Sequence, residues 1–130
     1  MRVITGTARG RVLRTLEGED VRPTTDRVKE AVFSIIQFEI EGRRVLDLFA
    51  GSGQLGIEAL SRGAASATFV DMSKDSLSAV KYNLEHTKLG DNAKVVQTDA
   101  LSFLKLTKDK FDIVFLDPPY ASSLVVDSMK

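Results

Sequence analysis

An aspartate, two prolines and a tyrosine follow directly on an apolar stretch near the end of this 130-residue sequence. The stretch, Ile113 to Leu116, is rich in β-favouring residues, as is typical of a strand buried on both faces of a parallel sheet. The prolines have fixed φ angles and no N–H, so they end the strand and leave carbonyl oxygens to accept other hydrogen bonds. A carboxylate, an outward carbonyl and an aromatic ring here predict a receptacle for a planar ring that carries an amine; a rigid turn with a solvated aspartate is the alternative. The candidate catalytic residues are Asp117, Pro118, Pro119 and Tyr120.

A glycine-rich loop in the middle of the chain is the second candidate site. Gly51, Gly53 and Gly56 fit the spacing G-x-G-x-x-G, which allows a tight turn and a close approach of the backbone to a ligand. Asp71 lies twenty residues beyond Gly51, at the end of the next predicted strand, where a carboxylate can accept both hydroxyls of a ribose. The pattern predicts a ligand that contains adenosine. Glycines that serve helix packing and an acid that serves only as a helix N-terminal charge are the alternative.

Two further acids favour S-adenosylmethionine over a dinucleotide as that ligand. Asp47 stands four residues before Gly51, where it would repel a pyrophosphate but attract a positive amino group. Asp99 follows the next predicted strand and is placed to accept a hydrogen bond from an adenine amine. No second mononucleotide-binding half follows, as a nicotinamide enzyme would usually need. The candidate cofactor-binding residues are Asp47, Phe49, Ala50, Gly51, Ser52, Gly53, Asp71, Met72, Asp99 and Ala100.

Strands and helices alternate along the chain from Val45 onward, which gives these residues their frame. Repeated units of this length require right-handed crossovers and predict an α/β fold with a doubly wound, mostly parallel sheet. Ligands of such sheets bind outside the carboxyl ends of the strands. Strands are predicted over 45–49, 67–70, 94–97 and 113–116, and helices over 54–62, 73–87 and 100–106, with Gly63 ending the first and Ser73 capping the second.

The amino-terminal part of the chain is basic. Its first sixteen residues carry four arginines and no acid, whereas the whole chain balances 18 basic against 18 acidic residues. We expect residues 1–22 to form an arm with a β-hairpin that turns at Gly10, and residues 23–130 to form the main domain. A local basic arm is a weak signal for nucleic acid, and a merely solvated face is the alternative. A helix should follow, capped by a threonine of the Pro23 to Asp26 segment, with Val28, Val32, Ile35 and Ile36 on its buried face.

The composition of the chain indicates the cellular compartment in which the protein works. The chain has no cysteine, which excludes disulfides and thiolate metal ligands and fits a reducing cytoplasm. It shows neither the apolar core of a signal peptide nor a run long enough to span a membrane. His86, the single histidine, stands among charged residues and is expected at the surface, without a chemical role.

Together these residues resemble the class I, Rossmann-like S-adenosylmethionine-dependent methyltransferases. The Asp-Pro-Pro-Tyr sequence at 117–120 is the form typical of members that methylate exocyclic amines of nucleobases. Residues 6–11 and 22–33 are similar to the bacterial family that methylates the N2 atom of one guanine in 16S ribosomal RNA. The resemblance covers essentially the whole chain. It implies S-adenosylmethionine as cofactor, 16S ribosomal RNA or a small-subunit assembly particle as partner, a cytoplasmic location, and no metal.

The resemblance also implies a role for each candidate residue. Asp117 and the Pro118 carbonyl would accept both protons of the guanine amine and Tyr120 would stack on the base, while Arg9, Arg11 and Arg14 would contact RNA phosphates. Other readings stay open: methylation of adenine N6 in DNA, a nicotinamide oxidoreductase, or an RNA-binding module without activity.

The carboxyl end departs from the family pattern, because members usually continue beyond the Asp-Pro-Pro-Tyr strand with further strands and helices. Only residues 121–130 remain here, enough for a short helix. The strand 113–116 would then be an exposed apolar edge, which soluble proteins avoid or protect. We therefore expect a longer protein whose C-terminal strands are missing from this sequence, or self-association through that edge.

Overall fold

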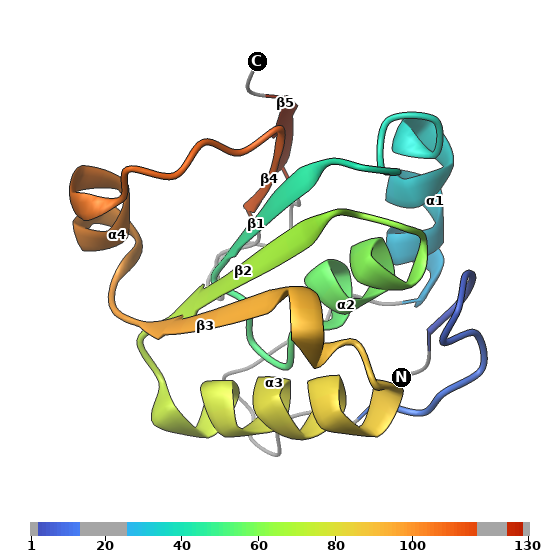
Figure 1. Cartoon of the computed structure of the whole chain (residues 1–130), viewed down its shortest axis with the longest axis horizontal. Helices are drawn as coiled ribbons and strands as arrows, with labels where there is room; N and C mark the ends of the chain where they lie inside the picture. Colours follow the sequence, from blue (N-terminus) through green and yellow to red (C-terminus); the bar gives the residue numbers. More distant parts are fainter. Residues whose placement is uncertain (1–2, 14–25, 117–124, 129–130) are drawn as a thin grey trace.

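The computed structural model of the chain describes residues 3–13, 26–116 and 125–128. One five-stranded sheet in the order β3-β2-β1-β4-β5 organises them (Figure 1). The first four strands pair in parallel and β5 pairs with β4 antiparallel. This confirms the mostly parallel sheet. The strands are β1 (Arg44–Leu48), β2 (Ser66–Asp71), β3 (Ala93–Gln97), β4 (Ile113–Leu116) and β5 (Val125–Ser128).

Helices lie on both sides of the sheet, as a doubly wound fold requires (Figure 1). Three of them share one side with the amino-terminal segment, and α4 covers the other. The helices are α1 (Asp26–Ile36), α2 (Gln54–Ser61), α3 (Lys74–Thr87) and α4 (Ala100–Leu106), with a 3-10 turn, η1 (Gly90–Asn92), before β3. The strands and helices predicted between Val45 and Leu116 are confirmed, with ends that differ by a residue or two.

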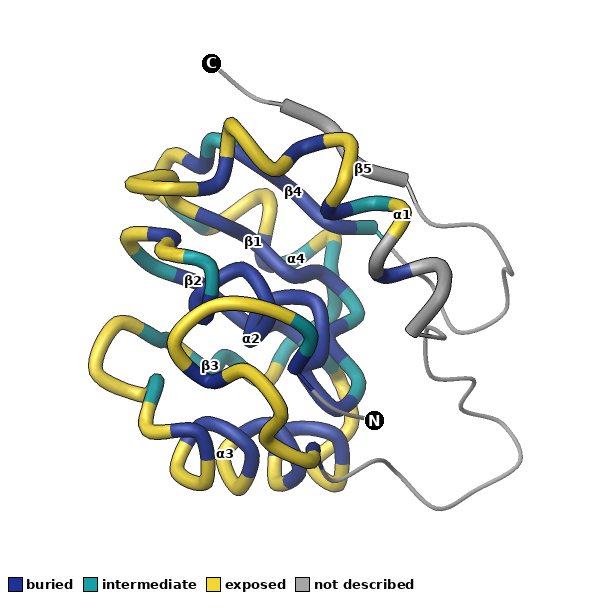
Figure 2. Tube along the Cα trace, turned by 90° about the vertical axis from the view of Figure 1, so that its right-hand side faces the viewer, coloured by how far each residue is buried: buried dark blue, intermediate teal, exposed yellow. Residues whose placement is uncertain are grey.

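Two hydrophobic clusters follow from this layering. The larger one fills the space between the sheet and α1, α2 and α3, and Phe33, Phe69 and Phe115 are fully buried in it. The smaller one lies under α4 and is built around Phe103 and Phe111, whose ring centroids are 6.2 Å apart. Figure 2 shows the result: β1, β2, β4 and α2 are buried along most of their length, β3 is only partly buried, and α3 alternates between buried and exposed turns. Burial on both faces explains why the strands read as apolar runs.

Local signals set the helix ends where the sequence predicts them. Ser73 caps α3 by accepting the Ser76 N–H at 3.2 Å. Gly63 takes φ 103° just after α2 and donates to Leu60 O, while Ala64 N donates to Ala59 O. That pair of bonds is the Schellman arrangement, which favours glycine at the left-handed position.

The buried face of α1 differs from the prediction. Ile35 is 81% exposed, so its place on that face is wrong, whereas Ile36 is buried and Val32 is partly buried. Phe33 and Lys29 supply the rest of the buried face. The apolar spacing alone did not reveal this, because it gave no weight to a lysine as an inward residue. Val28 and the residues before Asp26 lie outside the part of α1 whose side chains are described.

The amino-terminal segment pairs Val3 with residues 10–11 in the manner of a hairpin and has a strand bridge at Val12, while the rest of the two predicted strands lies outside the described residues. Residues 3–13 form a compact series of turns that two backbone bonds close: Val3 N donates to Arg11 O and Gly10 N to Val3 O, both at 2.9 Å. Gly10 takes φ 84°, as predicted for the turn. Val3, Ala8 and Leu13 are buried in the larger cluster, so the segment packs against the helices instead of projecting as an arm.

The predicted exposed edge of β4 is wrong. β5 pairs along the full length of β4, from Ile113 opposite Ser128 to Leu116 opposite Val125. An antiparallel strand forms where a short helix was expected, because Val125 and Val126 favour extended backbone and β4 offers a row of unpaired backbone groups. The stated reason for self-association through that edge therefore falls away.

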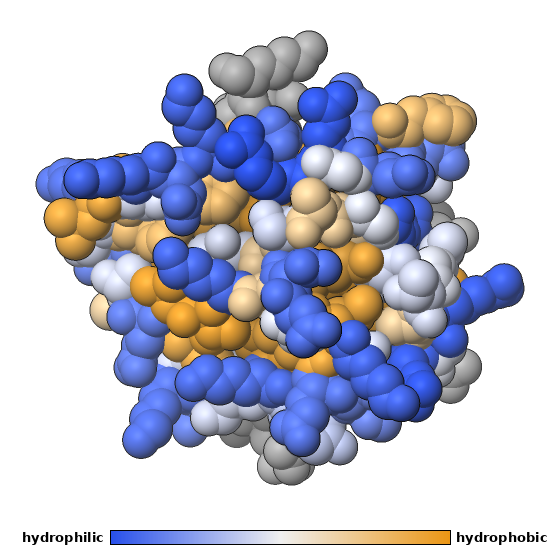
Figure 3. Space-filling view, in the orientation of Figure 1, coloured by the Kyte–Doolittle hydropathy of each residue, from blue (hydrophilic) through white to orange (hydrophobic). Residues whose placement is uncertain are grey.

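Figure 3 shows hydrophobic side chains in the middle of this face, surrounded by hydrophilic ones. Smaller hydrophobic areas lie over α1 at the upper right and over α4 at the left. Exposed apolar residues at these places include Ile35, Phe38, Leu101 and Leu106. None of the helices in the described ranges has the length and apolar character needed to cross a membrane.

Candidate cofactor site

Three connections meet at the carboxyl ends of the parallel strands. The loop 49–53 follows β1, Asp71 ends β2, and Asp99 follows β3 (Figure 1). Because β1, β2 and β3 are adjacent and parallel, their carboxyl ends lie at one edge of the sheet. The structure thus brings the predicted cofactor residues of three separate segments together, at the edge where such sheets bind ligands.

The loop after β1 has an unusual backbone. Phe49, Gly51 and Gly53 all have positive φ, at 60°, 58° and 83°. Ala50 N donates to Val70 O at 3.0 Å and Gly53 N to Ala50 O at 2.8 Å, which hold the loop against β2. A phenylalanine in the left-handed region costs energy and persists where the surroundings impose it, typically at functional sites.

The three glycines of the loop serve different needs. A Cβ on Gly51 would meet nothing within 4 Å, so the backbone there borders open space. A Cβ on Gly53 would touch Val80 at 3.1 Å, and one on Gly56 would overlap Phe69 at 2.3 Å. Gly53 and Gly56 therefore let α2 approach α3 and the sheet, and Gly51 leaves the backbone accessible to a ligand. The alternative interpretation, that these glycines serve helix packing, is therefore correct for Gly53 and Gly56.

Asp71 connects the end of β2 to this loop. One oxygen accepts the Gly51 N–H at 3.0 Å and the other accepts the Ser73 N–H at 2.8 Å. The residue is half-buried. It fixes the loop and the start of α3 while keeping part of its carboxylate at the surface, where a ribose could reach it.

Asp99 acts as the N-cap of α4. One carboxylate oxygen accepts the Ser102 N–H at 2.8 Å and the other accepts the Ser102 hydroxyl at 2.7 Å. These two bonds from Ser102 hold the pKa of Asp99 below its usual value, because they favour the charged form. Since both oxygens already accept bonds, Asp99 supports α4 in addition to any contact with an adenine.

Asp47 lies beneath the loop and not at its mouth. Its side chain is 1% exposed and accepts the Gly56 N–H at 3.1 Å. A carboxylate at the first turn of a helix satisfies an N–H that has no partner within the helix. In this structure Asp47 fixes the direction in which α2 leaves the loop.

The other predicted cofactor residues have varied surroundings. Ser52 is buried, and its carbonyl accepts the Asn83 side-chain N–H at 2.9 Å, a contact from α3 that the sequence did not predict. Ala50 is buried, Ala100 and Phe49 are half-buried, and Met72 is 69% exposed at the edge. The predicted catalytic residues 117–120 and Arg14 lie outside the described residues. Arg9 and Arg11 are exposed on the amino-terminal turn.

A surface groove of about 350 Å³ lies at the opposite edge of the sheet. Its lining includes Arg44, Ser66 and Ala93, which stand at the amino ends of β1, β2 and β3. Parallel sheets bind ligands at their carboxyl ends, so we do not assign the cofactor to this groove. Within the described ranges, no group of three or more His, Cys, Asp or Glu side chains could hold a metal ion.

The sheet order, the helices on both faces and the loop after β1 define a Rossmann-like α/β fold of the class I methyltransferase type. A solved structure, yhhF from Escherichia coli, is 44% identical and superposes with a TM-score of 0.83 over 96% of this chain and 67% of its own. A second, described as "A putative sam-dependent methyltransferase from Streptococcus mutans", is 25% identical with a TM-score of 0.65 over 77% of this chain and 27% of its own.

Sequence comparison names the family. The family model described as "Conserved hypothetical protein 95" matches residues 1–130, and the chain belongs to this family. The Ribosomal RNA small subunit methyltransferase D of Haemophilus influenzae is 44% identical over 127 residues, which are 95% of this chain and 66% of that protein. The chain thus spans about two thirds of the length of this relative.

Proposed function

We propose that this chain carries the S-adenosylmethionine-binding part of a methyltransferase that modifies the exocyclic N2 amine of a guanine in 16S ribosomal RNA. The observation that carries the proposal is the contact between the loop after β1 and the end of β2, in which Asp71 accepts the Gly51 N–H at 3.0 Å beside open space at Gly51. A relative named as a ribosomal RNA small subunit methyltransferase supports ribosomal RNA as the acceptor.

The residues at the carboxyl edge fit this cofactor. The accessible backbone of Gly51 lets a ligand lie close to the loop, and the half-buried Asp71 offers acceptor oxygens to ribose hydroxyls. Asp99 and Ala100 would border the adenine, and the exposed Met72 would cover one side of the ligand. When bound, S-adenosylmethionine supplies an electrophilic methyl group on a sulfonium leaving group.

Residues 117–120 would bind the guanine that accepts the methyl group. The lone pair of the guanine amine is delocalised into the ring, which makes the nitrogen a poor nucleophile. Hydrogen bonds from its two protons to the Asp117 carboxylate and the Pro118 carbonyl would localise that lone pair. Pro119 would hold the turn rigid, and Tyr120 would stack on a base that has left any helix. Most of the catalytic effect would then come from alignment and local electrostatics.

The amino-terminal turn is the proposed contact with RNA. Arg9 and Arg11 are exposed on it, and Arg14 follows in the sequence. Guanidinium groups bind phosphates in a sequence-independent way, so these residues would position the RNA and not select the base. The partner would be 16S ribosomal RNA or an assembling small subunit, which places the protein in the cytoplasm.

One experiment separates this function from its rivals: methyl transfer from labelled S-adenosylmethionine, offered separately to ribosomal RNA and to DNA. Label on RNA at guanine N2 supports the proposal. Label on DNA adenine instead assigns the second function that the Asp-Pro-Pro-Tyr sequence allows. Cofactor binding with no transfer to either acceptor points to a binding module.

Asp117→Ala is the matched variant for that assay. It should abolish transfer while cofactor affinity stays within a few-fold, since Asp117 is expected to face the acceptor amine. If most of the turnover remained, the argument from the lone pair would fail.

A further inference from the structure

The amino-terminal turn is fixed to α2 by a set of polar contacts that were not predicted from the sequence. Ile4 N and Thr5 N donate to the two carboxylate oxygens of Glu58 at 2.8 and 3.0 Å. Ala8 N donates to the Ser61 hydroxyl at 3.0 Å, and that hydroxyl donates to Thr5 O at 2.6 Å. A segment with only surface contacts would leave these backbone groups to water, whereas here α2 binds them.

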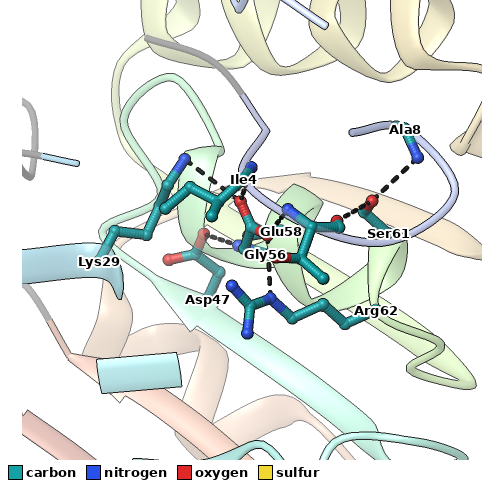
Figure 4. A network of polar contacts seen from close by, with 9 residues as sticks. Ile4, Ala8, Lys29, Asp47, Gly56, Glu58, Ser61 and Arg62 are labelled. Atoms are coloured by element: carbon teal, nitrogen blue, oxygen red, sulfur yellow. Dashed lines mark hydrogen bonds and ion pairs between the residues drawn. The ribbon is translucent and has the colours of Figure 1, made fainter. Parts of the chain in front are cut away.

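Glu58 lies at the centre of this arrangement (Figure 4). It is fully buried, and besides the two backbone N–H groups it pairs with Lys29 at 3.5 Å and with Arg62 at 2.9 Å. Lys29 comes from α1 and is itself fully buried. The guanidinium of Arg62 stacks over the ring of Phe33, 4.7 Å from its centroid, which joins α1 to α2 a second time.

Helix α2 begins directly after the loop 49–53 that we assign to the cofactor, the cofactor loop. Asp47 accepts the Gly56 N–H, and Glu58 follows within the next turn of α2. Figure 4 shows Asp47 beside the Glu58 network. The turn that presents Arg9 and Arg11 is therefore held on the helix whose first turn fixes the loop 49–53. A rigid helix with the turn at one end and the loop at the other sets the spacing between them.

Gly6 lies where the amino-terminal turn packs most tightly against the end of α2. A Cβ at this position would stand 1.8 Å from the carbonyl oxygen of Ser61, a backbone atom that cannot rotate away. Gly10 has a similar positive φ, 84° against 94°, but a Cβ there would meet nothing within 4 Å. The positive φ would strain an alanine at either position, but only an alanine at position 6 would also clash with α2.

We infer that Glu58 and Ser61 are positioning residues, which hold the turn 3–13 as a preorganised contact for RNA phosphates at a fixed distance from the cofactor loop. The inference rests on the proposed function for the role of the turn. Because the backbone of the turn is already ordered, binding RNA does not have to pay for ordering it, and the exposed Arg9 and Arg11 start from defined positions.

Gly6→Ala is the variant that tests this, with Gly10→Ala as its matched control. In Gly6→Ala, we expect amide hydrogen exchange at Ile4, Thr5 and Ala8 to rise by at least about tenfold and RNA affinity to fall by about three- to tenfold. Cofactor affinity should stay within about twofold. Gly10→Ala should leave exchange at these amides and RNA affinity near the wild-type values. The Lys29–Glu58 pair is intact in both variants, so the fold should persist.

Ser61→Ala approaches the same contact from α2 and should loosen the Ala8 amide, with the exposed Ser78→Ala on α3 as its control. Equal RNA affinity for Gly6→Ala and Gly10→Ala, or unchanged exchange in Gly6→Ala, would overturn the inference. If replacing both Arg9 and Arg11 with alanine left RNA affinity unchanged, the proposed RNA contact would be wrong. The hydrogen-exchange data would still measure how firmly the turn 3–13 is held on α2.

Discussion

Glu58 and Asp71 are carboxylates that each accept two backbone N–H bonds, and they lie at different depths in the molecule. Glu58 accepts two such bonds from residues 4 and 5, and it is fully buried between α2, α1 and the amino-terminal turn. Asp71 also accepts two, from the cofactor loop and from the start of α3, but it is half-buried at the edge of the sheet.

The comparison separates two roles for one kind of contact. A buried carboxylate that loses a partner leaves charges in a medium that cannot solvate them, so its bonds are permanent parts of the fold. A carboxylate at the surface can exchange a backbone partner for water or a ligand at modest cost. We therefore expect changes at Glu58 to act on stability and changes at Asp71 to act on ligand binding.

Glu58→Ala should have the largest effect. It removes the acid that pairs with the buried Lys29 and the acceptor of two backbone N–H groups, and breaking a buried pair costs roughly 3–5 kcal/mol of unfolding free energy. Urea unfolding followed by circular dichroism measures it. Replacing both charges, as in Glu58→Gln with Lys29→Met, should recover part of the loss. A Glu58→Ala protein as stable as Asp71→Ala would remove the distinction between the two regions.

Asp71→Ala should act mainly on the cofactor. Each charge-assisted hydrogen bond to a ribose hydroxyl is worth roughly 1.5–3 kcal/mol, so calorimetry should show S-adenosylmethionine binding at least about tenfold weaker. Asp75→Ala, which removes an exposed acid from the first turn of α3, is the matched control and should bind normally. Unchanged affinity in Asp71→Ala, or a preference for NAD, would refute the assignment of this edge to the cofactor.

Gly56→Ala tests whether Gly56 serves packing against the sheet, in contrast to Gly51, which borders open space. The added methyl would overlap the buried Phe69 ring, and overpacking of this kind costs roughly 1–3 kcal/mol. Thermal unfolding should show the loss. Gly51→Ala meets no neighbour, so its cost should come from its positive φ and from a poorer approach of the ligand to the backbone. If the two variants lost equal stability and equal cofactor affinity, the separate roles of the glycines would be wrong.

Asp99 should give the smallest effect, visible as a dependence on pH. Its pKa is lowered in the folded protein by the bonds from Ser102, so its stabilising contribution is fully present above the unfolded value of about 3.9. That contribution is lost as the pH falls through the lower folded value. The difference in melting temperature between wild type and Asp99→Ala should therefore be constant near neutral pH and shrink below about pH 4. A difference that grows on acidification would have the wrong sign.

The sequence by itself determined the order of strands and helices, because the signals for them are local. Apolar runs flanked by polar residues predicted β2 and β4, and Ser73 and Gly63 set helix ends through bonds that reach only a few residues. The parallel order of the strands then placed Asp71 and Asp99 at the edge where sheets of this kind bind ligands, without any knowledge of packing.

Tertiary structure decided what each polar side chain does. Asp47 looked like a residue at the mouth of a loop and is buried under α2, and Ile35 looked buried and is exposed. Glu58 was not predicted, although a charge in a helix that is otherwise uncharged was a signal that could have pointed to it. The docking of residues 3–13 and the pairing of β5 with β4 join segments far apart in the chain. Burial and long-range hydrogen bonds depend on which elements meet, and the periodicity of one segment carries no information about its neighbour.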